Sequence, residues 1–220
     1  MKNIVQIIAF GITHLTDARY FAAWEVDYLA FPVGEGNPEA ISWDYLHALR
    51  EWVEGPAIVA ELGVIDDVDD WVRTLVEHRI DHALLTYPAP ASAPEKLAAA
   101  GIKTLLHIPI EGYQTADDVA EMLQEGGAAG AMVLDFERGG ITLSDLEAGH
   151  PFGLDELDAL LQNHSCLLRI DLGDTDPKAF SKAHPLAGYA VRGSSEEKVG
   201  YKSFDDLDGL FEGLEVFEEL

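Results

Sequence analysis

The chain has 220 residues, of which 48% are hydrophobic, so it can bury one substantial core and is too apolar for an intrinsically disordered protein. Forty acidic and fourteen basic residues give a formal net charge of −26, which opposes binding to nucleic acid or to an anionic membrane surface. There is a single cysteine, Cys166, and neither a membrane-length apolar run nor a signal-peptide pattern, so the sequence predicts a cytoplasmic protein without disulfides.

Short apolar segments alternate with amphipathic segments along the whole chain. The apolar segments predict strands over residues 3–9, 28–32, 57–62, 82–86, 103–108, 131–135, 166–171 and 187–191. The segments with helical periodicity predict helices over residues 15–24, 42–53, 68–78, 94–100, 116–124, 154–161, 177–183 and 204–210. Ser42 and Asp67 are plausible N-caps, and Pro94 and Pro177 suit first helical turns.

This alternation predicts an α/β protein with a parallel sheet, because buried parallel strands need helices on the sheet's faces. Eight strand–helix units within 220 residues favour a (β/α)8 TIM barrel, with residues 1–220 as its single domain. A doubly wound open sheet is the alternative. In a barrel the chemistry lies at the C-terminal ends of the strands, so the residues after each predicted strand are the candidates for a site.

Three motifs on the predicted elements carry a resemblance to a known family. They are Phe10-Gly11-Ile12-Thr13 at the first strand, Leu134-Asp135 followed by Gly139-Gly140 at the sixth, and Arg192-Gly193-Ser194 with Gly200-Tyr201-Lys202 at the eighth. In this order the motifs resemble phosphoribosylanthranilate isomerases, which are (β/α)8 barrels of tryptophan biosynthesis. The resemblance covers nearly the whole chain.

The resemblance implies an Amadori rearrangement of a phosphorylated aminosugar, which needs a base and an acid within reach of the substrate. It places the acid at Asp135, but the base position holds Phe10, whose ring carries no proton. His14 and His107 are candidates for a replacement base, and His14 is preferred because it follows Phe10 by four residues. Glu39 stands where the resemblance implies a substrate-holding arginine, and a carboxylate there repels an anion.

The resemblance also implies a phosphate site built from glycine N–H groups after the seventh and eighth strands. The candidate anion-binding residues are Gly139, Gly140, Gly173, Arg192, Gly193 and Ser194. Arg192 suits bidentate pairing with an anion, whereas Gly139 and Gly140 also suit a simple turn. The acids Asp171, Asp174 and Asp176 indicate a different possibility, a hard-cation site made of oxygen ligands.

The sequence therefore predicts a divergent isomerase-like barrel without the family's standard Amadori activity, with a site for a small phosphorylated metabolite or another small anion at the strand C-terminal face. Two alternatives stay open. One is an active phosphoribosylanthranilate isomerase with Asp135 as acid and an unconventional base, and the other is a barrel that uses a metal at residues 171–176. The favoured prediction includes no cofactor, no metal, no nucleic-acid or membrane partner, and a monomer or homodimer.

Overall fold

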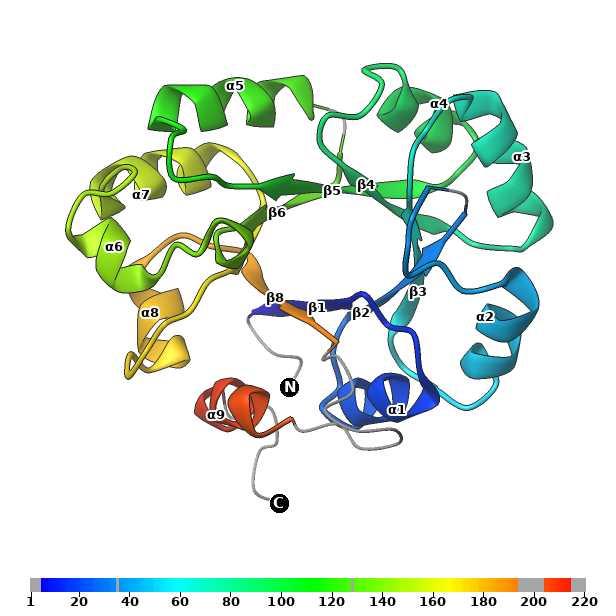
Figure 1. Cartoon of the computed structure of the whole chain (residues 1–220), viewed down its shortest axis with the longest axis horizontal. Helices are drawn as coiled ribbons and strands as arrows, with labels where there is room; N and C mark the ends of the chain where they lie inside the picture. The colour runs from blue at the N-terminus through cyan, green and yellow to red at the C-terminus, as the bar shows by residue number, and fades with distance from the viewer. Residues whose placement is uncertain (1–4, 35, 128, 194–203, 215–220) are drawn as a thin grey trace.

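Eight parallel strands close into a barrel with helices arranged around it (Figure 1). The computed structural model describes residues 5–34, 36–127, 129–193 and 204–214. The strands are β1 (Gln6–Phe10), β2 (Tyr28–Val33), β3 (Ala57–Leu62), β4 (His82–Thr86), β5 (Lys103–Pro109), β6 (Ala131–Asp135), β7 (Cys166–Arg169) and β8 (Gly188–Arg192). The helices in this part of the chain are α1 (Leu15–Ala23), α2 (Trp43–Arg50), α3 (Val68–Glu77), α4 (Ala93–Ala99), α5 (Ala116–Glu125), α6 (Leu143–Glu147), α7 (Leu154–Asn163), α8 (Pro177–Ala183) and α9 (Asp205–Gly213), with a 3₁₀ turn, η1 (Glu137–Gly139).

The barrel is closed by the pairing of the first strand with the last. β1 runs parallel to β8, with Gln6 beside Gly188 and Phe10 beside Arg192. The other neighbouring strands pair in parallel as well. This closure confirms the predicted (β/α)8 barrel and excludes the open sheet, in which the two outer strands would each have one neighbour.

Alternating side chains of the strands form two buried layers. In β1, Ile8 and Phe10 belong to a cluster inside the barrel, while Ile7 and Ala9 belong to the larger cluster beneath the helices. The inner cluster consists of Ile8, Phe10, Ala30, Val59, Leu84, Leu105, Ala131, Val133, Leu167 and Ala190. Because both faces of each strand are buried, the strands are nearly continuous apolar runs, which is why the sequence predicted them.

Most element bounds agree with the predictions to within a few residues. Ser42 and Asp67 cap α2 and α3 by accepting backbone hydrogen bonds, as expected. β7 ends at Arg169, so the predicted strand over residues 166–171 was too long. The α6 helix was not predicted, because a helix of five residues is too short to show a periodic pattern.

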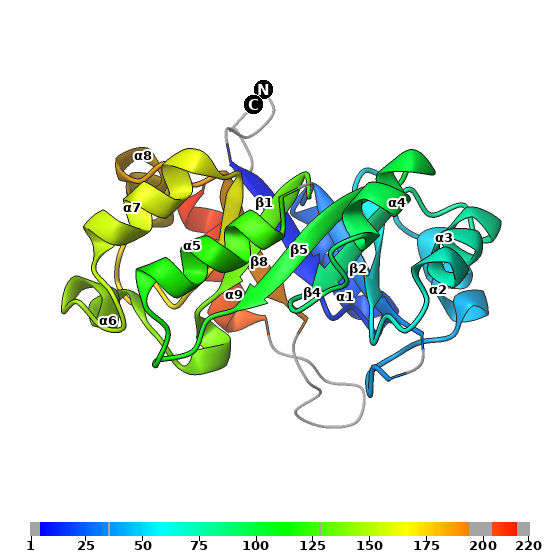
Figure 2. The same cartoon turned by 90° about the horizontal axis from the view of Figure 1, so that it is seen from above.

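The α9 helix packs on the outside of the barrel beside α1. Tyr20 stacks on Phe204 with ring centroids 3.9 Å apart, and Trp24 stacks on Phe211 at 5.1 Å. Figure 2, turned by 90°, shows α5, α6 and α7 on one side of the strands and α2, α3 and α4 on the other. Within the described ranges, no helix has the length and apolar character needed to cross a membrane.

Candidate functional site

The C-terminal ends of the strands bring polar side chains together over the barrel interior, in a region we call the mouth. The mouth residues at or near the strand ends are Phe10 of β1, Glu61 of β3, His107 of β5, Asp135 of β6, Arg169 of β7 and Arg192 of β8. Glu61, His107 and Asp135 are buried despite their polarity, at 9%, 4% and 2% exposure. Buried titratable groups of this kind are concentrated at functional sites in proteins.

Asp135 is surrounded by hydrogen-bond donors. Arg169 Nη1 lies 2.9 Å from Oδ1 and 3.1 Å from Oδ2, His107 Nε2 lies 2.9 Å from Oδ2, and the Arg138 N–H donates to Oδ1 at 3.1 Å. Burial raises the pKa of Asp135, but the His107 hydrogen bond, the nearby Arg169 and His107 charges and the Arg138 N–H together hold it below its usual range. These contacts favour the ionised form of Asp135, whereas the general acid that the resemblance implied has to carry a proton that it can donate.

Of the two histidines considered as replacement bases, His107 lies among the buried residues of the mouth. Its Nε2 faces the Asp135 carboxylate, so a neutral imidazole carries its proton on Nε2 and keeps a lone pair on Nδ1. Its ring lies 5.3 Å from the ring of Phe10. His14 lies in the loop after β1, directly before α1, at an exposed position, so the preference for it as a replacement base stays a prediction.

Phe10 fills the barrel interior just beneath the arginines. The side chain is 1% exposed and belongs to the inner apolar cluster. The guanidinium carbons of Arg192 and Arg169 lie 5.4 Å and 5.7 Å from its ring centroid, within the range of cation–π attraction. The position that would carry a base in the resembled family is thus occupied by a packed ring at the floor of the mouth.

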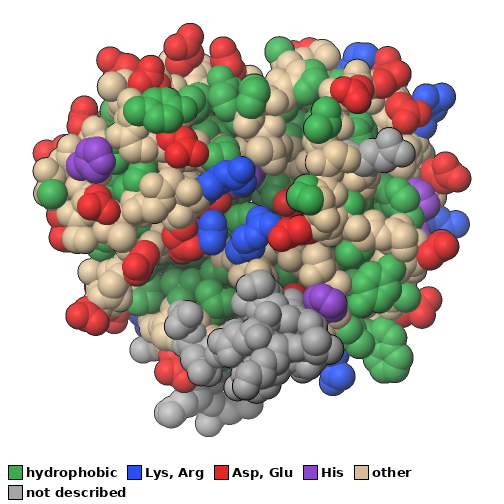
Figure 3. All heavy atoms as spheres, viewed as in Figure 1, with side chains coloured by type: hydrophobic (Ala, Val, Ile, Leu, Met, Phe, Trp, Pro, Cys, Tyr) green, Lys and Arg blue, Asp and Glu red, His purple; other side chains and the backbone are tan. Residues whose placement is uncertain are grey.

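Three arginines line the mouth of this strongly acidic protein. Arg138 and Arg192 line a cavity of about 720 Å³, and Arg169 and Arg192 line a neighbouring cavity of about 900 Å³. Arg192 pairs with Glu39, and Arg169 pairs with Glu137 at 2.7 Å as well as with Asp135. Figure 3 shows Lys and Arg side chains gathered at the centre of this face, with acidic side chains around them.

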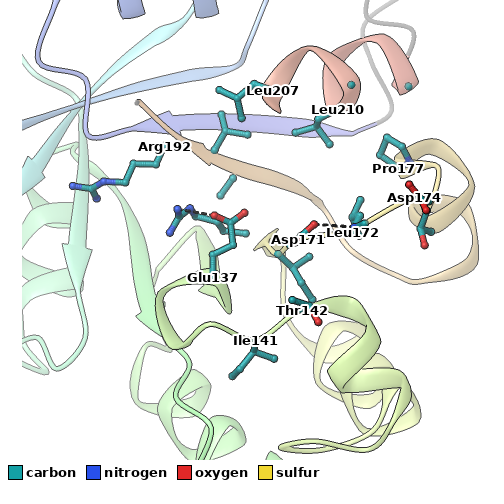
Figure 4. Close-up of a pocket in the computed structure, with 18 of the residues that line it drawn as sticks. Glu137, Ile141, Thr142, Asp171, Leu172, Asp174, Pro177, Arg192, Leu207 and Leu210 are labelled. Carbon is teal, nitrogen blue, oxygen red and sulfur yellow. Dashed lines mark hydrogen bonds and ion pairs between the residues drawn. The ribbon is translucent and has the colours of Figure 1, made fainter. Parts of the chain in front are cut away.

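The larger cavity is lined by both charged and apolar side chains (Figure 4). Arg192 and Asp174 lie on opposite sides of the view, and Glu137 and Asp171 lie between them. Leu207 and Leu210 of α9 add an apolar wall. The cavity therefore offers positive charge mainly at its end near the barrel axis.

The glycines expected to cradle phosphate already use their N–H groups. Within the described chain, the glycine donors and their acceptors are Gly139 to Phe136 O at 3.1 Å, Gly140 to Glu137 O at 3.0 Å, Gly173 to Asp171 Oδ1 at 2.9 Å, and Gly193 to Phe10 O at 2.9 Å. A Cβ on Gly139 would lie 2.2 Å from Ile110 O, and Gly140 has a φ of +69°, so these glycines serve close packing and turning. Ser194 lies outside the described residues. An anion at the mouth would therefore meet the arginine side chains that line the two cavities, rather than these N–H groups.

The acidic loop after β7 has local structural contacts. Asp171 accepts from the Gly173 N–H at 2.9 Å, and Asp176 caps α8 by accepting from the Ala179 N–H at 2.8 Å. Asp174 is exposed. No group of three or more His, Cys, Asp or Glu side chains in the described ranges is arranged to hold a metal ion, so the metal alternative gains no support from this loop.

The sequence interpretation missed Glu61, Arg138 and Arg169. Glu61 is the fifth residue of the apolar strand Ala57–Leu62, and Arg169 ends the apolar strand Cys166–Arg169. A charged residue near the C-terminal end of an otherwise apolar barrel strand is a signal for an inward-facing site residue. Arg138 lies in the η1 turn directly after β6, within the region expected to hold the site, but its side chain was not singled out.

This chain resembles known proteins in its structure but not detectably in its sequence. In sequence, the chain matches no protein-family model and no curated protein. In structure, it is similar to the phosphoribosyl anthranilate isomerase of Thermus thermophilus, with a TM-score of 0.69 and 20% identity over 96% of this chain and 98% of that one. It is also similar to monomers of the dimeric isomerase of Thermotoga maritima, with a TM-score of 0.70 and 15% identity over 97% of this chain and 100% of that one.

A third similar structure is a phosphoribosyl anthranilate isomerase in complex with reduced 1-(o-carboxyphenylamino)-1-deoxyribulose 5-phosphate. Its TM-score is 0.69 and its identity is 14%, over 97% of this chain and 100% of that one. The protein is thus a closed (β/α)8 barrel with the fold of the phosphoribosylanthranilate isomerases. Identities at this level establish the shared fold, while function has to be argued from the site.

Proposed function

We propose that this protein is a divergent relative of phosphoribosylanthranilate isomerase that binds a small anionic metabolite at the mouth of its barrel. Arg138, Arg169 and Arg192 provide the positive charge. The observation that carries the proposal is the convergence of these three side chains on adjoining cavities in a chain with a net charge of −26. Arginine suits phosphate and carboxylate groups because its planar fork of N–H donors matches their geometry.

The similar isomerase in complex with a carboxyphenylamino-deoxyribulose phosphate supports an anion of this kind. That ligand carries a phosphate and a carboxylate on one small molecule. The two adjoining cavities of this chain share Arg192, which suits a small ligand with an anionic group near the barrel axis. A phosphorylated metabolite or another small anion is therefore the proposed ligand class.

The proposal includes the absence of the family's standard Amadori reaction. That reaction requires a proton acceptor and a proton donor at the substrate. Phe10 supplies neither, and the contacts of Asp135 with Arg169 and His107 favour the ionised form of its carboxyl group. The two residues that the resemblance pairs as base and acid are therefore unsuited to those roles.

A second candidate is an active isomerase with an unconventional base. It is favoured by the hydrogen bond between His107 and Asp135, which leaves the Nδ1 lone pair of a neutral His107 available to accept a proton. Loss of phosphoribosylanthranilate fluorescence on adding the protein distinguishes the two candidates. We expect no turnover above the uncatalysed rate, whereas turnover that disappears in His107→Gln would establish the second candidate.

The test of anion binding is calorimetric titration with inorganic phosphate. Arg192→Ala should weaken phosphate binding by about tenfold or more, because a hydrogen bond to a charged group contributes about 1.5–3 kcal/mol. Arg73→Ala is the matched control, because Arg73 is an exposed arginine on α3 that also pairs with one carboxylate, that of Asp70. Equal phosphate affinity in the two variants would contradict the proposal.

A further inference from the structure

Glu61 is a buried carboxyl group of the mouth that has no role in the anion binding proposed above. Its Oε2 accepts a hydrogen bond from the Gly11 N–H at 2.9 Å. Among the described residues, Oε1 accepts no hydrogen bond. The side chain is 9% exposed and lines the cavity of about 720 Å³, so its second oxygen is left for the occupant of that cavity.

The charged groups near Glu61 come from several elements of the barrel. Arg192 of β8 and His107 of β5 favour its ionised form, and Glu39 of the loop after β2 opposes it. Arg138 lines the same cavity. The guanidinium of Arg192 pairs with the carboxylate of Glu39 rather than with that of Glu61. Among the described residues, Glu61 forms no ion pair.

Burial is the largest influence on Glu61. It raises the pKa of this carboxyl group, and the Gly11 N–H, Arg192 and His107 offset only part of the effect. An anion at the arginines would add a negative charge beside Glu61 and would engage Arg192. Both changes disfavour a second negative charge in the same cavity, because like charges repel strongly where water is scarce.

We propose that Glu61 takes up a proton when an oxyanion occupies the mouth and then donates a hydrogen bond from Oε1 to that anion. The inference rests on the proposed function, because it requires an anion at the arginines. One proton moves from solvent to the Glu61 carboxylate, and no bond of the anion is broken. The ligand class is narrowed to fully ionised oxyanions, such as phosphate esters or sulfates, that can accept this hydrogen bond.

Sulfate is the probe of choice, because its charge stays constant over the pH range in which Glu61 titrates. Calorimetric titrations in buffers with different ionisation enthalpies report how many protons enter with each sulfate. Above the pKa of Glu61, wild type should take up close to one proton per sulfate, and its affinity should fall by up to about tenfold per pH unit. Glu61→Gln should bind sulfate with little proton uptake and a nearly flat pH profile.

Glu39→Gln is the matched control, because it removes another carboxylate that faces Glu61 and Arg192. It should strengthen sulfate binding by releasing Arg192 while keeping the proton uptake. Carboxyl NMR of wild type provides a second measurement that needs no variant, and sulfate should raise the pKa of Glu61. If Glu61→Gln took up as many protons per sulfate as wild type and kept the wild-type pH profile of sulfate binding, this inference would be overturned, while anion binding would stand. Sulfate affinity unchanged in Arg192→Ala would instead overturn the proposed function itself.

Discussion

At the scale of single residues, Asp135 should be important for stability. Replacement by Asn removes the negative charge between Arg169 and His107 while keeping the side chain's size. Breaking a buried ion pair by removing one partner costs about 3–5 kcal/mol, and we expect about 3 kcal/mol because Arg169 keeps Glu137. Urea unfolding at neutral pH measures this loss of unfolding free energy.

The pH dependence of that loss follows from the lowered pKa of Asp135. A carboxyl group with a lower pKa in the folded state stabilises the protein above its unfolded pKa, and this contribution disappears as the pH falls through the folded pKa. The difference between wild type and Asp135→Asn should therefore shrink on acidification. Asp70→Asn, which breaks an exposed ion pair with Arg73, is the control and should cost less than about 1 kcal/mol. Similar losses in the two variants would show that the Asp135 contacts contribute little.

The same scale shows what could be predicted about the site. Asp135 and Arg192 were identified because they lie at strand ends within motifs, and both face the mouth. Their contacts could not be read from the sequence, because they depend on Arg169 and Glu39, which are distant along the chain. Glu61 was missed because a strand that is buried on both faces shows no apolar–polar alternation, so only the single acid in the run Ala57–Leu62 marked an inward-facing side chain.

At the scale of elements, the connection between β6 and α6 holds one wall of the mouth. Gly140 turns the chain with a φ of +69°, and Thr142 forms a capping box with Asp145 at the start of α6. The Leu143 N–H donates to Asp171 O at 2.9 Å, which ties this connection to the loop after β7. A helix this short forms few intrahelical hydrogen bonds, so its position depends on its capping box and on the hydrogen bond to the loop after β7.

Removal of this cap should be measurable. Thr142→Ala should lower the unfolding free energy by about 1 kcal/mol, within the range of about 0.5–2 kcal/mol for lost N-caps. It should also weaken phosphate binding, because the connection carries Arg138. Thr115→Ala, in the equivalent capping box of α5, is the control and should lower stability by a similar amount without changing phosphate affinity. Equal phosphate affinities in the two variants would show that α6 does not support the mouth.

At the scale of the whole molecule, the fold could be predicted more fully than the site. Alternation of eight buried strands with helices follows from local composition, so the barrel was identifiable without knowledge of any contact. Closure pairs β1 with β8, the first and last strands of the described chain, and could only be inferred from the number of strands. The predicted monomer or homodimer and the absence of a cofactor stay predictions.

The net charge of −26 sets a further property of the whole molecule. Forty acidic side chains on one compact barrel repel one another, and this repulsion is weaker in the expanded unfolded chain. Salt shortens the Debye length from about 30 Å at 0.01 M to about 3 Å at 1 M, so it relieves the repulsion mainly in the folded state. Sodium chloride should therefore raise the Tm at pH 7.5.

The acidic isoelectric point provides an internal control for this effect. Near pH 4.3 the chain carries little net charge, so the same salt series should change the Tm much less than at pH 7.5. Thermal unfolding followed by circular dichroism at both pH values makes the comparison. A salt-induced rise of equal size at both pH values would indicate a general effect of salt on burial rather than screening. A fall in Tm at pH 7.5 would mean that attractive pairs, such as those at the mouth, outweigh the repulsion between the acids.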